Sequence, residues 1–547
     1  MTHAASRARA PRRPSCKRQL EKVSSKTSHH SPGFKVRTPQ APRTGHEIPP
    51  NPFRTAEFRN PNPPTPRLLL PLLLLNFEPS PPFHPHTNRA RSPPLLPPSL
   101  PHPIRVRAPQ SPISTASAPA MEFDGGMDAL PDVVVQHILS QLSNARDVAA
   151  CAAVARCWRG CVPFLPSLYF PRGAFESAPG GGAAASAVAA ADDAIGRMVA
   201  AAERLEELVV YCPFSASLLP RWVAARAATL RVLELRVDSA AADKSGHLDC
   251  IGAAAGLQEL RLWGLTMARP PAWGQMERLR VLEIVGAVLG EAAVNGAVAA
   301  CPNLTDLALL GCECAGEAAI SLPLLERCRL DFVGAGNCSL RLAAPRVESL
   351  EVQGFCWISL QGGDRLKHLT ISKNTGSVYH VEMGKLPELD QLSLRGVQWS
   401  WGAISSVLLC ASEVRHLVMK VEFCGDYDTL QPFPEIDLVE FFNSHPKLCK
   451  FEIHGAMFAA LCQKNSLKNL DSRFAIPCLE HVLVTVRSPL NAEQKLSTLE
   501  SLVRYSVGLR RMIIRISQMK NCHDASDDFF EEICKFTYMN SGRVCIE

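Results

Sequence analysis

The chain of 547 residues lacks the short motifs by which many enzymes are recognised. It has no glycine-rich dinucleotide loop after an expected strand, no Walker loop, no HExxH and no GxSxG. The glycine run at 180–182 lies in an Ala/Ser/Gly-rich stretch, 173–194, whose composition is typical of a flexible connector. The sequence therefore predicts a protein that is not an enzyme and that uses no cofactor.

Long apolar runs are missing as well. The only apolar cluster in the first 120 residues, RLLLPLLLL at 67–75, is far shorter than the roughly 20 residues that span a bilayer, and Pro71 interrupts it. It also begins too far from the N-terminus for a secretory signal peptide. We therefore expect no membrane partner.

Cysteine and histidine are present, but the spacings that bind metals are not. Of 20 cysteines, 19 are scattered through 121–547 without a CxxC pair or a Cys/His ladder of zinc spacing. Cys328 stands at a leucine position of a repeat described below. Most of these cysteines are therefore interpreted as buried, reduced thiols, which indicates a reducing compartment and no metal site.

Acidic residues are almost absent from the first 120 residues. That segment has no Asp and 4 Glu against 18 Lys+Arg, a net charge of +14, and it holds 26 of the 44 prolines. Residues 121–547 carry 40 Lys+Arg and 48 Asp+Glu, a net charge of −8. We expect 1–120 to be a disordered arm. It has no ordered stripe of arginines and aromatics, so no nucleic-acid partner is expected.

The arm has two interpretations. Its Arg-rich, Ser-rich and acid-poor composition resembles an organelle transit peptide. The alternative is that translation starts at Met121 or Met127, because MEFDGGMDALP reads like a natural beginning.

An L-x-x-L-x-L pattern with conservative replacements recurs from residue 205 onward. Its copies are 19 to 34 residues apart, and nine of the twelve intervals lie between 19 and 27, close to the period of leucine-rich repeats. One copy cannot bury its apolar side alone, whereas stacked copies form one core and a curved parallel sheet. The copies begin at Leu205, Leu230, Leu257, Leu279, Leu304, Leu325, Val347, Leu366, Leu389, Val414, Leu448, Leu479 and Leu509.

The expected fold is therefore of the α/β class, a leucine-rich-repeat solenoid whose convex side is helical or irregular. Alternation along the strands places a second set of side chains on the concave face, where they are candidates for binding a target protein. For each of them, an ordinary solvated surface residue is the alternative. Trp263 is the strongest candidate, because an exposed aromatic is an expected contact anchor. The candidates are Glu234, Arg236, Arg261, Trp263, Glu283, Arg329, Asp331 and Arg395, to which alternation adds Glu351 and Lys420.

An apolar helix is expected at LPDVVVQHILSQL, residues 130–142. Pro131 suits the first helical position, and Asp132 favours the positive end of the helix dipole. Ser143-Asn144 ends this helix, and a second apolar helix is expected from about 146 to 158. About 40 residues rarely form a self-sufficient core, so another surface must cover part of their apolar side chains.

These helices carry a resemblance to a known family. LP-(x)6-IL-(x)2-L, followed by Asp147-Val148, Val154 and Cys-Trp-Arg at 157–159, resembles an F-box across about 128–170. The whole of 121–547 resembles the plant-type F-box/leucine-rich-repeat proteins, whose C-terminal section is often an FBD-like variant of the repeat. The alanine-rich AACAAVA departs from the family pattern, which usually has larger apolar residues there.

The resemblance implies a substrate receptor of an SCF-type ubiquitin ligase. In that family, the F-box binds a Skp-type adaptor and through it a cullin, and the repeats capture a target protein, which this sequence does not identify. The alternative for each adaptor-binding candidate is a core residue of the helical module. The adaptor-binding residues implied by position are Leu130, Pro131, Val134, Ile138, Leu139, Leu142, Val148, Val154 and Trp158.

The expected domains are the arm at 1–120, the F-box at 125–170, a connector at 171–204, the solenoid at 205–475 and variant repeats at 476–547. The alternative function is a leucine-rich-repeat scaffold without a ligase, in which the helices at 128–160 only cap the solenoid. The connector argues against a cap, unless its Ala-rich part is a helix that joins the stack. The expected localisation is the nucleus or cytoplasm, with the plastid as the alternative.

Overall fold

The residues that the structure describes all belong to one compact unit, Thr115–Glu547. The predicted arm lies outside the described residues, and so does the glycine run at 180–182. The computed structural model describes residues 130–142, 144–175, 184–237, 247–314, 316–334, 338–373, 377–422, 433–463, 474–517 and 523–547.

A small helical module begins the described chain. It consists of α1 (Asp132–Ser140), α2 (Ala145–Val154), α3 (Arg156–Cys161) and the 3-10 helix η2 (Val162–Phe164). The Asn144 side chain caps α2 by accepting a hydrogen bond of 3.0 Å from the backbone N–H of Arg146. The expected single helix over 146–158 is wrong in one respect, because Ala155 is extended and separates α2 from α3.

The module joins the solenoid through two packed elements. β1 (Ser167–Phe170) pairs in parallel with β2 (Glu207–Val210). Within the expected connector, α4 (Ala184–Ala201) buries Ala191, Ile195 and Val199 in the main core. This Ala-rich part is therefore a packed helix and not a flexible linker.

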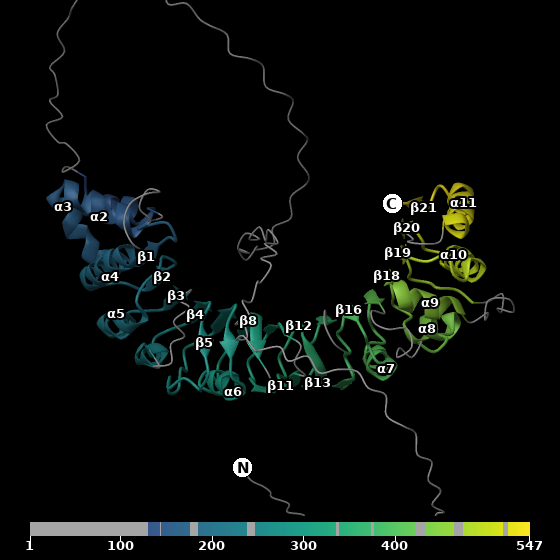
Figure 1. The fold of residues 1–547 in the computed structure, drawn as a ribbon, viewed down its shortest axis with the longest axis horizontal. Coiled ribbons are helices and arrows are strands. Elements are labelled where there is room, and N and C mark those ends of the chain that lie inside the picture. Colours follow the sequence, from purple (N-terminus) through teal and green to yellow (C-terminus); the bar gives the residue numbers. More distant parts are fainter. Residues whose placement is uncertain are drawn as a thin grey trace, which may run out of the picture. The chain divides into compact units, whose positions relative to one another are not determined.

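One parallel sheet follows the concave side of the curved solenoid (Figure 1). Each strand pairs with the next in register, and together with β5 and β7 the sheet has seventeen strands. After β1 and β2, the ladder continues through β3 (Val232–Arg236), β4 (Glu259–Trp263), β6 (Val281–Val285), β8 (Asp306–Cys314), β10 (Arg327–Phe332), β12 (Ser349–Gln353), β14 (His368–Lys373), β16 (Gln391–Val397), β17 (His416–Glu422), β18 (Lys450–His454), β19 (His481–Val486), β20 (Arg511–Ile516) and β21 (Val544–Ile546).

The repeat pattern accounts for this ladder. Each of the thirteen predicted copies supplies one strand from β2 to β20, and its last two apolar residues point into the core. Leu208, Leu233 and Leu260, for example, are register partners and at most 1 % exposed. The predicted solenoid is therefore confirmed.

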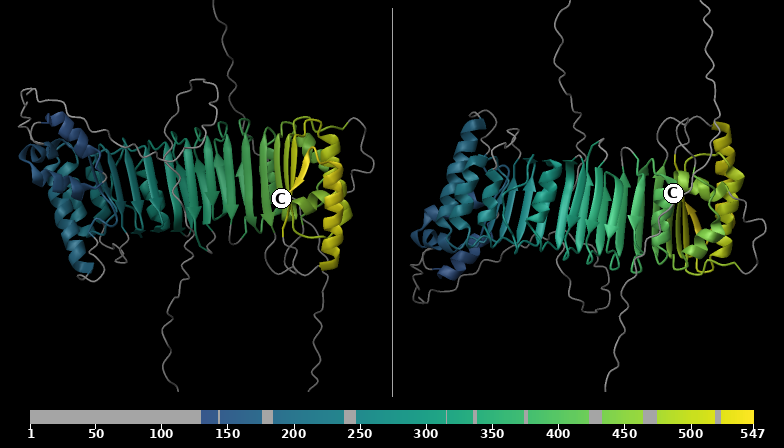
Figure 2. Two further views of the ribbon diagram at one scale, coloured as in Figure 1. Left: turned by 90° about the horizontal axis from the view of Figure 1, so that it is seen from above. Right: turned by 90° about the horizontal axis from the view of Figure 1, so that it is seen from below.

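The convex side changes along the solenoid (Figure 2). In the middle it is a second parallel sheet of β9 (Glu317–Ser321), β11 (Cys338–Ala343), β13 (Phe355–Gln361) and β15 (His380–Met383). Besides α4, the remaining convex elements among the described residues are two short strands, two 3-10 helices and seven α-helices. These are η3 (Ala216–Leu218), α5 (Leu219–Arg226), η4 (His247–Ala253), β5 (Thr266–Met267), β7 (Val288–Leu289), α6 (Glu291–Ala299), α7 (Trp401–Cys410), α8 (Leu438–Ser444), α9 (Gly455–Gln463), α10 (Ala492–Tyr505) and α11 (His523–Met539).

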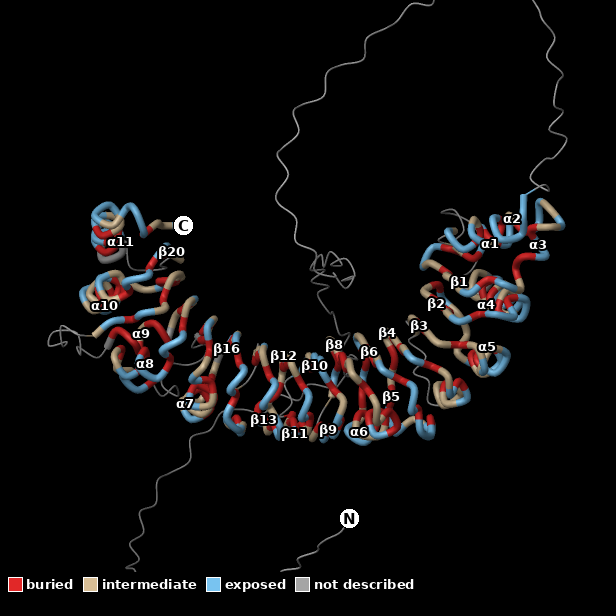
Figure 3. The backbone as a smooth tube through the Cα atoms, turned by 180° about the vertical axis from the view of Figure 1, so that it is seen from behind, coloured by how far each residue is buried: buried red, intermediate tan, exposed pale blue. Residues whose placement is uncertain are grey.

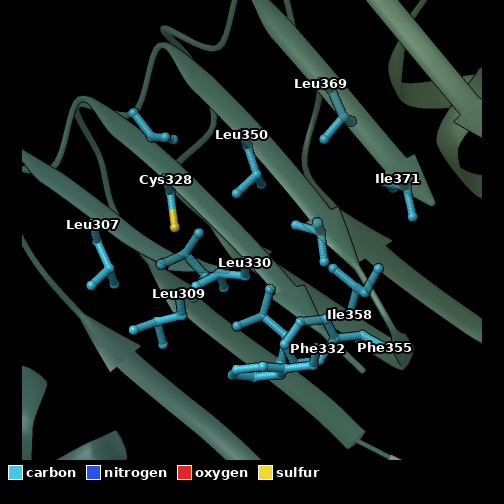
Figure 4. Packing of buried hydrophobic residues seen from close by; sticks show 14 of the residues in the cluster. Leu307, Leu309, Cys328, Leu330, Phe332, Leu350, Phe355, Ile358, Leu369 and Ile371 are labelled. Atoms are coloured by element: carbon cyan, nitrogen blue, oxygen red, sulfur yellow. The ribbon is translucent and has the colours of Figure 1, made fainter. Parts of the chain in front are cut away.

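The core lies between the concave sheet and this convex layer, and buried residues follow it along the whole curve (Figure 3). In the middle it is an apolar layer between two sheets, where Phe332 of β10 packs against Phe355 of β13 with ring centroids 4.9 Å apart (Figure 4). Cys328 occupies a leucine position in this layer, as expected, and is fully buried.

Candidate functional site

The helical module exposes apolar side chains that its own core does not use. Val133 on α1 is 75 % exposed and Val134 is 41 % exposed. Leu130, just before α1, is 37 % exposed, and Val154 at the end of α2 is 80 % exposed. We call these four residues the module surface. Leu130, Val133 and Val134 are close together in the sequence, and exposed apolar side chains that lie close together are typical of a surface that a partner covers.

Other residues expected at the adaptor interface lie inside the module. Leu139, Val148 and Trp158 are buried together in the module core. Ile138 and Leu142 are half-buried at its edge, and Pro131 is exposed. The buried residues can therefore support the module surface, but they do not form part of it in the isolated chain.

Sequence reasoning missed two exposed residues. Val133 was passed over because it falls off the helical stripe, although three consecutive valines on a helix cannot all face one core. Phe164 in η2 is 44 % exposed, and the Arg204 guanidinium lies 5.0 Å from the centre of its ring. The signal for Phe164 was weak, because an isolated aromatic after a helix is usually a core residue.

The residues expected on the concave face occupy two rows of the large sheet. Glu234, Arg261 and Glu283 are register partners on β3, β4 and β6, and Arg329 lies further along the same row on β10. Arg236 and Trp263 are partners in the second row, in which Asp331 and Arg395 lie further along. The strand pairing thus brings Glu234, Arg261 and Glu283 together. Arg329 and Arg395 lie apart from these three residues, and both are exposed.

Arg261 lies at the centre of an ion-pair cluster. Its guanidinium nitrogens are 2.8 Å from Glu259, 3.4 Å from Glu234 and 3.7 Å from Glu283 carboxylate oxygens. The Tyr211 hydroxyl donates a hydrogen bond to Glu234. Burial raises the pKa of Glu234, whereas the Arg261 charge acts in the opposite direction. Because three carboxylates share one guanidinium, the cluster carries an excess of negative charge.

Aromatic rings lie beside this cluster. Trp263 packs edge-on against Tyr211 with ring centroids 5.7 Å apart, and Tyr211 packs against Tyr169 at 5.6 Å. All three side chains are half-buried. Trp263 is therefore supported by neighbouring rings, and its remaining surface is open on the concave side.

Among the described residues, no group of three or more His, Cys, Asp or Glu side chains is arranged to hold a metal ion. The cysteines that the structure describes form no disulfide with one another, and burial raises the pKa of Cys328 to about 12. In the same described ranges, no helix combines the length and apolar character that crossing a bilayer requires.

Comparison with known proteins gives two matches. A family model described as F-box-like matches residues 127–169, which cover the helical module and all of β1 except Phe170. The F-box protein At1g10780 of Arabidopsis thaliana is 52 % identical over 426 residues, which are 77 % of this chain and 100 % of the relative.

Proposed function

Because the chain belongs to the F-box protein family, we propose that it is the substrate-recognition subunit of an SCF-type E3 ubiquitin ligase. Its F-box docks on a Skp-type adaptor and through it on a cullin, and its leucine-rich repeats capture a target protein. F-box proteins are typically non-catalytic, so ubiquitin transfer belongs to other subunits. The nucleus or cytoplasm is the proposed location, and residues 476–547 are the proposed FBD-like section.

The module surface carries this proposal. Val133 on α1 and Val154 on α2 are 75 % and 80 % exposed, although the module buries Val135 and Leu139 of α1. Complete burial of a valine side chain contributes about 1.5 kcal/mol or more, so covering this surface would supply a substantial part of adaptor binding.

A scaffold without a ligase is the second candidate, and one observation favours it. The module packs directly on the stack, as a cap would, and the Arg146 side chain donates a hydrogen bond of 2.8 Å to the Ala174 carbonyl oxygen beyond β1. A cap alone, however, gives no reason for Val133 and Val154 to face solvent. The ligase subunit therefore accounts for more of the module.

The test is binding of the full chain to a purified Skp1-type adaptor. Because Val133 and Val154 are exposed, Val133→Glu combined with Val154→Glu should leave folding intact and weaken the complex at least about tenfold. Val507→Glu, at a position 77 % exposed and far along the chain, is the matched control and should bind normally. Calorimetry measures the affinities. A folded chain that does not bind the adaptor would favour the scaffold.

A further inference from the structure

The helices α7 and α8 lie on the outer side of the solenoid (Figure 1). A groove between them is lined by residues of α7, of α8 and of the segment just before α8. Its volume is about 500 Å³, within the size range of ligand and side-chain pockets. It belongs neither to the module surface nor to the concave face. No role described above accounts for it.

The groove has an apolar lining. Leu408 and Phe441 lie at its base and are 8 % and 6 % exposed. Leu409 is 80 % exposed beside it, and Trp401 and Ile436 are half-buried. A leucine this exposed beside an apolar groove is typical of a surface that a partner protein covers.

The rim of the groove is acidic. Glu435, Asp437 and Glu440 line it, and among the described lining residues there is no Lys or Arg. Asp437 caps α8, because one of its carboxylate oxygens accepts hydrogen bonds from the N–H groups of Val439 at 2.8 Å and Glu440 at 3.2 Å. Glu435 and Glu440 line the groove and are exposed, so their carboxylates can pair with a cationic group that enters it.

The two walls are fixed to each other. The His445 ring lies 2.8 Å from the Phe441 carbonyl oxygen and 3.3 Å from the Leu408 carbonyl oxygen, and it thereby links α8 to α7. The backbone N–H of Ile436 donates a hydrogen bond of 3.1 Å to the Ala460 carbonyl oxygen on α9. A preformed groove loses little conformational entropy on binding.

We propose that this groove is a second docking site, which takes an amphipathic helix of a partner protein that carries a leucine-like anchor beside a lysine or arginine. The apolar base and Leu409 receive the anchor, and Glu435 and Glu440 attract the cation. The partner segment is helical because both walls are helices whose backbone groups bond internally. They offer no free edge to an extended strand, so the partner must satisfy its own backbone.

The test uses two fluorescein-labelled helical peptides with leucine at i, i+3, i+4 and i+7. One carries lysines on its flanks, and the other carries glutamates at the same positions. Fluorescence anisotropy with the full chain should give binding of the lysine peptide, at least about tenfold tighter than the glutamate peptide. Added salt should reduce this preference.

Two variants assign the binding to the groove. Leu409→Arg, and Glu435→Lys combined with Glu440→Lys, should each weaken binding of the lysine peptide at least about tenfold. Leu490→Arg is the matched control, because Leu490 is 71 % exposed in another part of the chain, and it should bind normally. Equal affinity for both peptides, or binding that survives Leu409→Arg, overturns the proposal. So does a dimer, detected by light scattering, that Leu409→Arg dissociates, because a second copy then occupies the groove.

Discussion

Glu234 shows how a single carboxylate on the concave face can lower stability even within an ion-pair cluster. Its side chain is 12 % exposed, and burial raises its pKa despite the nearby Arg261. The folded chain therefore binds this proton more tightly than the unfolded chain. The stability that this gives is present below the ordinary glutamate pKa and is lost as the pH rises through the raised pKa.

This sign leads to a prediction for Glu234→Gln. The free energy of unfolding should rise at neutral pH by about 1 kcal/mol, because glutamine can still accept the Tyr211 hydrogen bond and needs no desolvated charge. The advantage should shrink as the pH falls into the carboxylate range. Denaturant unfolding at several pH values measures it. A loss of stability at neutral pH would mean that the Arg261 pair outweighs the burial of the charge.

Strand alternation placed Glu234 and Arg261 on the correct face, but it could not predict their different environments. Glu234 is buried because the Tyr211 side chain, which belongs to the preceding repeat, covers it. Alternation predicts on which face of the sheet a side chain lies, but it does not predict how far neighbouring side chains cover it.

Interval length between repeats indicates which element forms the convex side. Where successive copies are 19 to 23 residues apart, from Leu304 to Leu389, the convex element is a strand of the second sheet. Where they are 30 or more residues apart, from Val414 to Leu509, it is a helix. A short interval leaves too few residues for a helix and two turns. This signal was available in the sequence, and so was Leu165-x-x-Leu168-x-Phe170, the missed copy that forms β1.

Short repeats require a tight turn from the concave to the convex sheet, and Gly354 provides the one between β12 and β13. Its φ is +95°, and an added Cβ would meet the Phe332 carbonyl oxygen. Gly354→Ala should therefore lower the free energy of unfolding by about 3 kcal/mol. Gly384→Ala is the control, because nothing lies within 4 Å of a Cβ there, and its stability should stay near that of the parent. Equal denaturation midpoints for both variants would contradict this.

At the scale of the whole molecule, the main hydrophobic core runs from Ala145 in α2 to Val544 in β21, and the module core is a separate, smaller cluster. Within the expected connector, α4 packs into the main core, and its Met198 side chain also packs against the module core. Composition alone could not show this, since alanine is common both in linkers and in helices that pack closely. The order of elements was predictable, but their continuity depends on contacts between repeats.

The last strand of a parallel sheet has an unpaired edge, which can pair with another chain unless it is covered. β21 covers the edge of β20, with Met512 opposite Val544, and α11 buries Phe529, Ile533 and Phe536 against the core. Deleting residues 523–547 should expose both an unpaired strand and apolar core, so the shortened chain should associate and melt at a lower temperature. Light scattering and thermal unfolding test this. Tyr538→Ser with Met539→Ser, at positions 84 % and 71 % exposed, should change neither. A monomeric deletion variant with an unchanged melting temperature would show that the stack ends stably at β20.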